Sequence, residues 1–572
     1  MNACVVLLVP NAPASLPQSV TTDRSPTPAK EGAPAAPRFP DTASVRRHCL
    51  SLVRQLPAAS RLVAVYLDPP ASFDPAQGIP GLEGVDELIV PEAGQGWTRS
   101  SLLSRLCEVL PPAPPPAAEE GASPEQKTAG SSATGSSVDL VWWAWADAPL
   151  LDLALAGRMF ERHSHWYAEY TNTDGWPAGF APELVNRASL DALAWIARED
   201  GEAVDRDLLF QVLQKDINAF EIETELSTVD LRPRRLSFFA DSRRNWLLIE
   251  RFLSHGYARV EDTISFVDDH PQDLRTLPAF VSIQTNGRCS QNCTLCPWPK
   301  WSHEQGGLLP TERSDFMALE DFKLILDKVV SFAGDAVIDL SLWGEAAHHP
   351  DIVGIAQAVL DRPSLSLLIE TSGIGWQEGC IEAILEAAKA APPRSGFPGS
   401  SRPGPLSWIV SMDAKDPARY RALRGDGQVE AVACTEKLLT LAPKSLWVQA
   451  LRLDDGEEDL EAFWRHWKDR GAQVIIQKYD FFAGWLPQRR AADLSPLKRQ
   501  PCWHLMRDVS VLVDGTVPLC REDLGRRSPA GNILKEAMEN IWKGSGQLWE
   551  SHASGIWPAH CTECDEYYTW NY

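Results

Sequence analysis

The chain has 572 residues, of which 44% are hydrophobic and 23% are charged, a composition typical of a globular protein too long for one hydrophobic core. Its formal net charge of -23 repels phosphate backbones and anionic lipid, and no cluster of Lys and Arg offsets it, so we expect neither nucleic acid nor a membrane as a partner. The sequence has no run of about 18 apolar residues, and its short apolar start, Ala3 to Pro10, lacks the basic flank of a secretory signal, so we expect a cytoplasmic protein.

The first part of the chain, residues 1–277, predicts an α/β domain. Short apolar strands alternate with helical stretches such as Ser101 to Leu110, and the strands lie at Cys4 to Val9, Arg61 to Leu67 and Leu140 to Ala144. Three stretches rich in Pro, Ala, Gly and Ser bury too little apolar surface to offset the entropy lost on ordering. We therefore expect flexible insertions or linkers at Asn11 to Thr42, Pro111 to Ser137 and Ala391 to Pro405.

The segment after the third of these strands, Trp145-Ala-Asp147-Ala-Pro-Leu150, resembles the Asp-x-Pro-Leu segment of nucleotide-sugar and cytidylyl transferases. In that family the Asp binds a metal and a nucleotide, and a carboxylate at a strand end suits Mg²⁺. The first strand here leads into Asn11-Ala-Pro-Ala-Ser without the Gly-rich loop whose amides cradle phosphate. The resemblance implies a degenerate transferase-like domain that binds a substrate or partner. The alternative is that Asp147 is an ordinary turn residue.

Residues 278–494 show a more regular alternation of strands and amphipathic helices, which predicts six βα units. The expected strands are Phe280 to Gln284, Val337 to Leu342, Leu365 to Glu370, Ser407 to Ser411, Leu446 to Arg452 and Gln473 to Lys478. The helices between them include Leu319 to Phe332, Ile352 to Leu360, Ile381 to Ala391 and Leu460 to Arg470. Right-handed crossovers would curl such units into a parallel sheet, an incomplete (β/α)6 barrel. A short cysteine-bearing segment, residues 495–572, follows.

Seven of the twelve cysteines fall into two groups, a distribution that indicates metal rather than disulfides in a reducing compartment. The first group, Cys289, Cys293 and Cys296, follows the first barrel strand, at the strand ends where barrel active sites are built. Three thiolates hold three irons of a cubane cluster and leave the fourth iron open to bind a substrate. The alternative is a zinc knuckle, in which His303 supplies the fourth ligand that structural zinc requires.

The spacing CxxxCxxC after the first strand of a βα barrel resembles the radical S-adenosylmethionine superfamily. The resemblance implies a 4Fe-4S cluster whose open iron chelates the amino and carboxylate groups of S-adenosylmethionine. Reduction then breaks the sulfonium bond, and a 5′-deoxyadenosyl radical abstracts hydrogen from the substrate. It also implies an electron donor such as a flavodoxin or a ferredoxin.

A second motif lies at the end of the second barrel strand. Trp343-Gly344-Glu345 is similar to the Gly-Gly-Glu motif of that family, whose backbone and carboxylate receive the ammonium group of the cofactor. A carboxylate is a charge-assisted acceptor for an ammonium. The chain departs from the family pattern at Trp343, where the first Gly is usual, and at Leu295, where an aromatic residue is usual.

Further matches follow the fourth barrel strand. Ser411 and Asp413, with Arg424 beyond them, resemble the family pattern that binds the carboxylate and ribose of the cofactor, and the planar guanidinium of Arg suits a carboxylate. Taken singly, these side chains are equally typical of strand ends and helix termini. Their order after the cysteine loop favours the cofactor site. The residues that act on the substrate are not assigned.

The second group of cysteines is Cys502, Cys520, Cys561 and Cys564. The spacing Cys-x12-Gly-x4-Cys, with a hairpin turn expected at residues 513–515 and a late CxxC, resembles the SPASM domain of radical enzymes. The resemblance implies one auxiliary 4Fe-4S cluster closed by four thiolates. A structural zinc ribbon is the alternative, because four thiolates suit zinc equally well.

Residues 501–504 (Pro-Cys-Trp-His) and residues 482–484 (Phe-Ala-Gly) together resemble the spiro-SPASM proteins. Because SPASM-bearing relatives commonly act on peptides, the resemblance implies hydrogen abstraction from a peptide or protein. Two alternatives remain. One is radical modification of a small or nucleotide-linked molecule presented by the transferase-like domain, and the other is a non-catalytic zinc-binding interaction protein.

Overall fold

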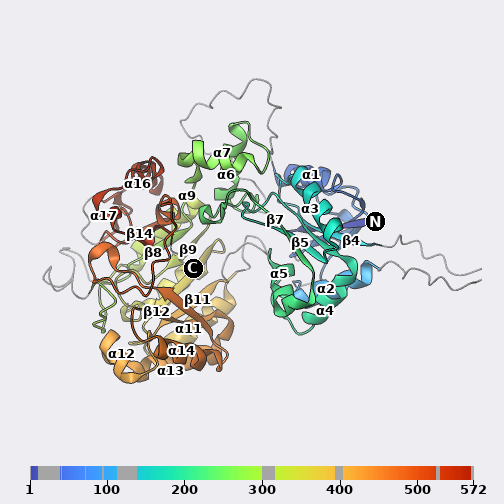
Figure 1. The fold of residues 1–572 in the computed structure, drawn as a ribbon. Coiled ribbons are helices and arrows are strands. Elements are labelled where there is room, and N and C mark those ends of the chain that lie inside the picture. Colours follow the sequence, from blue (N-terminus) through green and yellow to red (C-terminus); the bar gives the residue numbers. More distant parts are fainter. Residues whose placement is uncertain are drawn as a thin grey trace, which may run out of the picture. The chain divides into compact units, whose positions relative to one another are not determined.

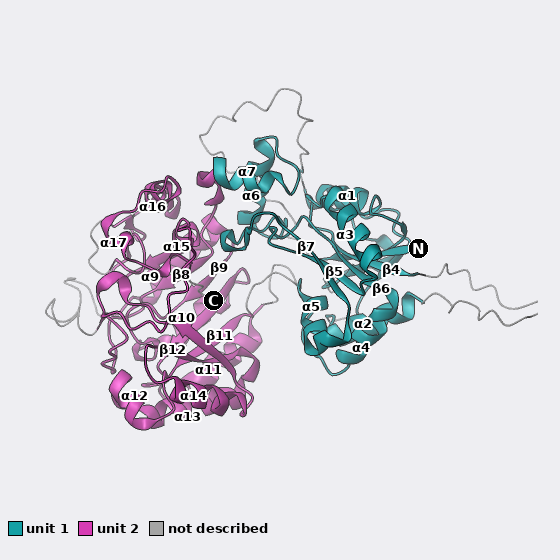
Figure 2. Cartoon of the chain, in the orientation of Figure 1, with its two compact units in different colours: residues 1–269, 396–401 teal, residues 270–395, 402–572 magenta. Residues whose placement is uncertain are grey.

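The computed structural model describes residues 2–10, 39, 41–70, 72–92, 96–111, 138–298, 316–392, 404–523 and 529–568. The chain divides into two compact units, the first ending at Asp269 and the second beginning at His270 (Figure 2). Most of the three expected linkers lies outside the described residues, and so does His303. Within these ranges, no helix is both long and apolar enough to cross a membrane.

Unit 1 is an α/β unit built on a seven-stranded sheet in the order β3-β2-β1-β4-β6-β5-β7 (Figure 1). Strands β1 to β4 are parallel, whereas β6 runs antiparallel to β4 and β5. The strands are β1 (Ala3–Val9), β2 (Ala59–Tyr66), β3 (Glu87–Ile89), β4 (Leu140–Trp145), β5 (Tyr170–Asp174), β6 (Glu183–Asn186) and β7 (Ile222–Leu226). The central strands β1 and β4 are buried along their whole length, as parallel strands covered on both faces require.

Four helices of unit 1 begin after polar residues whose side chains cap free backbone N–H groups. Asp41 and Thr98 form capping boxes with the third residue of their helices, and Asp152 and Ser242 accept from first-turn amides. The helices are α1 (Thr42–Val53), α2 (Arg99–Val109), α3 (Leu153–Trp166), α4 (Arg187–Ile196), α5 (Leu208–Leu213), α6 (Arg243–Ser254) and α7 (Asp262–Asp269).

Unit 2 is an α/β unit whose main sheet has seven parallel strands in the order β13-β12-β11-β10-β9-β8-β14 (Figure 1). The strands are β8 (Phe280–Ile283), β9 (Ala336–Asp339), β10 (Leu365–Thr371), β11 (Leu406–Ser411), β12 (Leu446–Arg452), β13 (Gln473–Lys478) and β14 (Asp508–Val511). The first six differ from the predicted strands by at most three residues at either end. The seventh, β14, is not predicted; it comes from the C-terminal segment and pairs with β8.

The two faces of this sheet carry different side chains. One face shares a large core with the helices α9 (Leu319–Ala333), α10 (Ile352–Leu360), α11 (Cys380–Ala390), α12 (Pro417–Arg424), α13 (Gln428–Leu441) and α14 (Glu457–Lys468). The other face has a small apolar cluster of Phe280, Leu368, Ile409 and Ile475. Because side chains alternate along a strand, a row of polar residues two positions farther along the strands shares this second face. The row is Ser282, Asp339, Glu370, Ser411 and Gln449.

The C-terminal segment packs against the start of unit 2 and contains α15 (Trp503–Arg507), β15 (Thr516–Val517), β16 (Gly531–Asn532), α16 (Met538–Ala553) and α17 (Ala559–Thr562). The guanidinium of Arg275 lies 3.4 Å from the ring centre of Trp542 in α16 and donates to its carbonyl at 2.9 Å. The chain turns at the predicted place, with Gly515 in a left-handed conformation (φ 80°). The strands on either side pair elsewhere, β14 with β8 and β15 with β16, instead of forming a simple two-stranded hairpin.

Candidate functional site

The first cysteine group lies in the loop that follows β8, at the carboxyl edge of the parallel sheet. Cys289 is exposed, whereas Cys293 and Cys296 are partly buried. Burial raises the pKa of the Cys296 thiol to about 12, so this thiol is protonated at neutral pH. Iron would therefore displace a proton when it binds the sulfur.

The Gly-Glu pair after β9 touches the start of this loop. The Glu345 N–H donates to the Arg288 carbonyl at 2.8 Å, and the Asn286 side-chain amide donates to the Glu345 carbonyl at 3.0 Å. A Cβ atom on Gly344 would lie 2.0 Å from the Asn286 carbonyl oxygen. Residue 344 must therefore be glycine for the two segments to approach this closely.

The carboxylate of Glu345 is buried and held in one orientation. It accepts from the Thr371 hydroxyl at 2.6 Å, from the Ser372 hydroxyl at 2.7 Å, and from the backbone N–H groups of Ser372 and Ala347 at 2.8 and 3.3 Å. These four donors match the four lone-pair positions of a carboxylate. An ammonium group would have to replace one of these four donors.

Arg424, at the end of α12, lies beside Cys293. The Cys293 sulfur is 3.8 Å from the Arg424 carbonyl oxygen, and the guanidinium is 2.5 Å from Asp413 and 3.2 Å from the Gln291 amide oxygen. Burial opposes the charge of Arg424, but Cys293 and Asp413 outweigh it and raise the pKa of the guanidinium above its ordinary value. Two predicted residues, Asp413 and Arg424, thus lie together next to the cysteine loop.

Ser411 lies on the polar row of the sheet. Its hydroxyl donates to Glu370 at 2.9 Å and accepts from the Gln449 amide at 3.2 Å. Next to them, burial raises the pKa of Asp339 to about 6. Among the described residues, Ser411 makes no hydrogen bond to the cysteine loop or to Arg424. The structure therefore groups Ser411 with the strand residues and not with the cysteine loop.

The two departures from the family pattern are both buried. Trp343 adopts a left-handed backbone (φ 43°) and stacks on Trp298, with ring centres 5.9 Å apart and planes tilted by 11°. Its carbonyl accepts from the Gln284 amide at 2.9 Å. Leu295 packs in the core shared with the helices. The indole therefore packs beside Cys296 while the backbone of residue 343 keeps a conformation that favours glycine.

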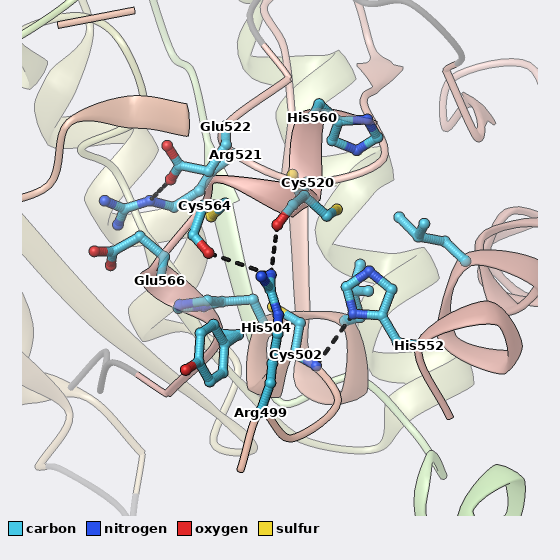
Figure 3. A pocket seen from close by; sticks show the side chains of 14 residues that line it. Arg499, Cys502, His504, Cys520, Arg521, Glu522, His552, His560, Cys564 and Glu566 are labelled. Carbon is cyan, nitrogen blue, oxygen red and sulfur yellow. Dashed lines mark hydrogen bonds and ion pairs between the residues drawn. The ribbon is translucent and has the colours of Figure 1, made fainter. Parts of the chain in front are cut away.

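The second cysteine group lines one pocket in the C-terminal segment (Figure 3). Cys502 precedes α15, Cys520 follows β15, Cys561 lies in α17 and Cys564 precedes the short 3-10 helix η8 (Glu566–Tyr568). Burial raises the pKa of Cys502 to about 12 and that of Cys561 to about 11. Four thiols far apart in sequence thus lie around one buried space, as a shared metal centre requires.

Several residues of this pocket carry no sequence signal. Arg499 donates to the carbonyls of Thr562 and Cys564 at 3.0 and 3.2 Å, so it fixes the backbone of the CxxC turn. His552, in the last turn of α16, accepts at Nδ1 from the Cys502 N–H at 3.3 Å. A histidine within an amphipathic helix is indistinguishable in sequence from a surface residue.

The aspartate of the transferase-like segment is paired with an arginine. Asp147 follows β4 and accepts two hydrogen bonds from Arg206, at 2.6 and 3.2 Å. The guanidinium lies 3.6 Å from the ring centre of Phe239. Because an internal cation already neutralises Asp147, this carboxylate does not offer an open Mg²⁺ position.

Comparison with known families finds one match within the second cysteine group. The family model SPASM, described as an iron-sulfur cluster-binding domain, matches residues 502–565. The matched segment contains all four of these cysteines. A protein of Treponema pallidum (strain Nichols), described as "Uncharacterized protein", is 33% identical over 373 residues, which cover 64% of this chain and 98% of that protein.

Solved structures with a related arrangement include BtrN in complex with AdoMet and 2-DOIA, and Streptococcus suis SuiB bound to the precursor peptide SuiA. BtrN is 15% identical, with a TM-score of 0.32 over 51% of this chain and 94% of its own. SuiB is 12% identical, with a TM-score of 0.37 over 62% of this chain and 78% of its own. Scores this low carry no argument about function.

Proposed function

We propose that this chain, which belongs to the family of the Treponema pallidum protein, is an iron–sulfur radical S-adenosylmethionine enzyme with a SPASM domain, and that its radical modifies a peptide or protein. The observation that carries the proposal is the cysteine loop after β8, which lies against residues 344–345 and Arg424 at the carboxyl edge of a parallel sheet. In this proposal the six consecutive strands β8 to β13, which are neighbours in one parallel sheet, correspond to the incomplete barrel of this class.

Each residue of this edge has a distinct task in the proposed reaction. Cys289, Cys293 and Cys296 hold three irons of a 4Fe-4S cluster, which when bound supplies the electron that breaks the sulfonium bond. Glu345 receives the ammonium of S-adenosylmethionine as a hydroxyl donor turns away, and the backbone of Gly344 leaves room for it.

The residues at the end of β11 and beyond it bind the carboxylate and ribose of the cofactor in this proposal. Arg424 binds the cofactor carboxylate, and Asp413 holds the guanidinium in position through their ion pair of 2.5 Å. In this proposal Ser411, which lies on the polar row at the end of β11, binds the ribose. The polar row beneath it lies on the sheet face opposite the helices, where the substrate would approach.

We propose one auxiliary 4Fe-4S cluster at Cys502, Cys520, Cys561 and Cys564. The SPASM match, which spans all four of these cysteines, supports it. Four protein thiolates close this cluster, so it transfers electrons instead of binding the cofactor. A zinc-binding interaction protein is the less favoured alternative, because the matching family model describes an iron-sulfur cluster-binding domain.

Unit 1, with the sequence boundary of residues 1–277, serves in this proposal as a degenerate transferase-like domain that binds the substrate or a partner. The pairing of Asp147 with Arg206 supports a binding role without metal catalysis. We place the enzyme in the cytoplasm, with a flavodoxin or a ferredoxin as its electron donor.

Electron paramagnetic resonance of reduced, anaerobically reconstituted protein tests the cofactor site. A variant with Cys561 and Cys564 changed to Ala retains the barrel cluster, and S-adenosylmethionine should change its spectrum because the cofactor binds the open iron. The matched variant with Cys289, Cys293 and Cys296 changed to Ala should give a spectrum that does not respond. An unresponsive barrel cluster would contradict the proposal.

A further inference from the structure

His552 is locked in one tautomer by the backbone of a cluster cysteine. The Cys502 N–H donates to Nδ1 of the imidazole at 3.3 Å, so Nδ1 is an acceptor and carries no proton. In a neutral imidazole the proton then resides on Nε2. His552 is therefore a hydrogen-bond donor at Nε2.

That donor is buried in the pocket of the second cysteine group. The His552 side chain is 2% exposed and lines the same pocket as the four cysteines (Figure 3). Its Nε2 atom has no hydrogen-bond partner among the described residues. A buried N–H without an acceptor costs roughly 1–3 kcal/mol, so a native structure supplies one. The Trp557 ring contacts the imidazole edge-on, with centres 4.7 Å apart, and limits its rotation.

We propose that Nε2 of His552 donates a hydrogen bond to a sulfur atom of the auxiliary cluster and raises its reduction potential. The inference rests on the proposed cluster at Cys502, Cys520, Cys561 and Cys564. A reduced cluster carries one more negative charge than the oxidised cluster, so a donor to sulfur stabilises the reduced form more. His552 is a positioning residue that tunes electron transfer and does not touch the substrate.

The neighbouring cation has a different task. Arg499 directs its guanidinium to the carbonyls of Cys561, Thr562 and Cys564, the backbone of the CxxC turn. The Trp557 and Tyr567 rings sandwich it at 4.7 and 4.6 Å. Arg499 thus orients two ligands through their backbone, whereas the Nε2 donor of His552 is left for the bound group.

The test uses the full-length chain with Cys289, Cys293 and Cys296 changed to Ala, so that the auxiliary cluster alone gives a signal. In this parent, His552→Phe removes the donor, and His552→Gln retains both an acceptor and an N–H donor. Anaerobic redox titration should show a lower potential for His552→Phe. A roughly tenfold shift toward the oxidised form is expected, about 59 mV for a one-electron couple. His552→Gln should recover most of that shift.

An unchanged potential in His552→Phe with intact iron content would overturn the proposal. If His552→Phe loses its cluster, a spectroscopic measurement on the parent triple variant tests the proposal instead. With ¹⁵N-labelled histidine, pulsed electron paramagnetic resonance of the reduced parent should detect coupling to one imidazole nitrogen, absent in His552→Gln. No histidine coupling in an iron-loaded parent would overturn the role of His552 alone. A parent that holds zinc and no iron would overturn the auxiliary cluster itself.

Discussion

Glu345 connects three strand ends at the scale of single residues. Its carboxylate is buried between the hydroxyls of Thr371 and Ser372, while its backbone meets Arg288 at the start of the cysteine loop. The side chain is thereby fixed in advance, so little conformational entropy would be lost if it binds the proposed cofactor. Exchanging one hydroxyl for an ammonium gives a charge-assisted bond.

We expect Glu345→Gln to weaken binding of S-adenosylmethionine by about 1–3 kcal/mol, because a hydrogen bond to a charged group is lost while the shape is kept. Iron content should stay unchanged, since Glu345 is not a cluster ligand. Isothermal titration of the anaerobic protein measures the affinity. Glu382→Gln, on the exposed side of α11, is the control and should bind as tightly as the wild type. Equal affinities in both variants would remove Glu345 from the site.

At the scale of residues, the sequence predicts those site residues that can be recognised from a short stretch of chain. The cysteine spacing fixes a loop, and Gly344 and Glu345 follow a strand whose neighbour carries that loop, so their meeting follows from sheet order alone. The position of Ser411 on the polar row depends on side-chain alternation in β11. His552 has no local signal at all, because its partner Cys502 is fifty residues away and becomes a neighbour only after folding.

At the scale of elements, a buried ionic network joins the end of β13 to the segment after the CxxC turn. Lys478 lies 3.0 Å from Asp565 and also pairs with Glu566, and all three side chains are at most 13% exposed. Burial raises the pKa of Glu566 to about 7 in spite of the lysine. The network holds the last cluster ligand, Cys564, against the edge of the sheet.

Lys478→Met should destabilise the protein by about 3–5 kcal/mol, because it leaves the buried carboxylate of Glu566 without its paired cation, while Asp565 keeps Arg490 at 3.1 Å. Denaturant unfolding measures the loss. The matched control is Lys389→Met, whose partner Glu386 and own side chain are both exposed, and which should cost no more than about 0.5 kcal/mol. A loss in Lys478→Met no greater than in the control would show that the network does not secure this segment.

Elements with a strong local pattern are predicted within a few residues, as for β10 to β13 and the helices α9 and α10. Their apolar period is visible in one stretch of chain. The strand β14 is missed because it has four residues and takes its place through pairing with β8, more than two hundred residues earlier. The turn at Gly515 is predicted from its residue types, but its partners are set by this distant pairing.

At the scale of the whole molecule, the C-terminal segment and the βα sheet form one compact unit, while the first 269 residues form another. The strand β14 explains why the sequence boundary at residue 494 is not a structural one. The same strand brings the second cysteine group into the unit that holds the first. Both proposed cluster sites therefore belong to one compact unit.

The wild-type chain should bind about eight irons, four for each of two 4Fe-4S clusters, and the double variant Cys561→Ala, Cys564→Ala about four. Iron, sulfide and zinc analysis of anaerobically purified protein provides the count. The double variant should still cleave some S-adenosylmethionine but should not turn over its substrate. One zinc and about four irons in the wild type would show that the second cysteine group is a structural zinc site and not an auxiliary cluster.

Cleavage of S-adenosylmethionine tests the central claim most directly. Reduced, anaerobic wild-type protein should form 5′-deoxyadenosine and methionine, because three thiolates leave one iron open to the cofactor. Chromatography of the products should show this activity lost in the Cys289→Ala, Cys293→Ala, Cys296→Ala triple variant. Full cleavage by that triple variant, or none by an iron-replete wild type, would contradict the account.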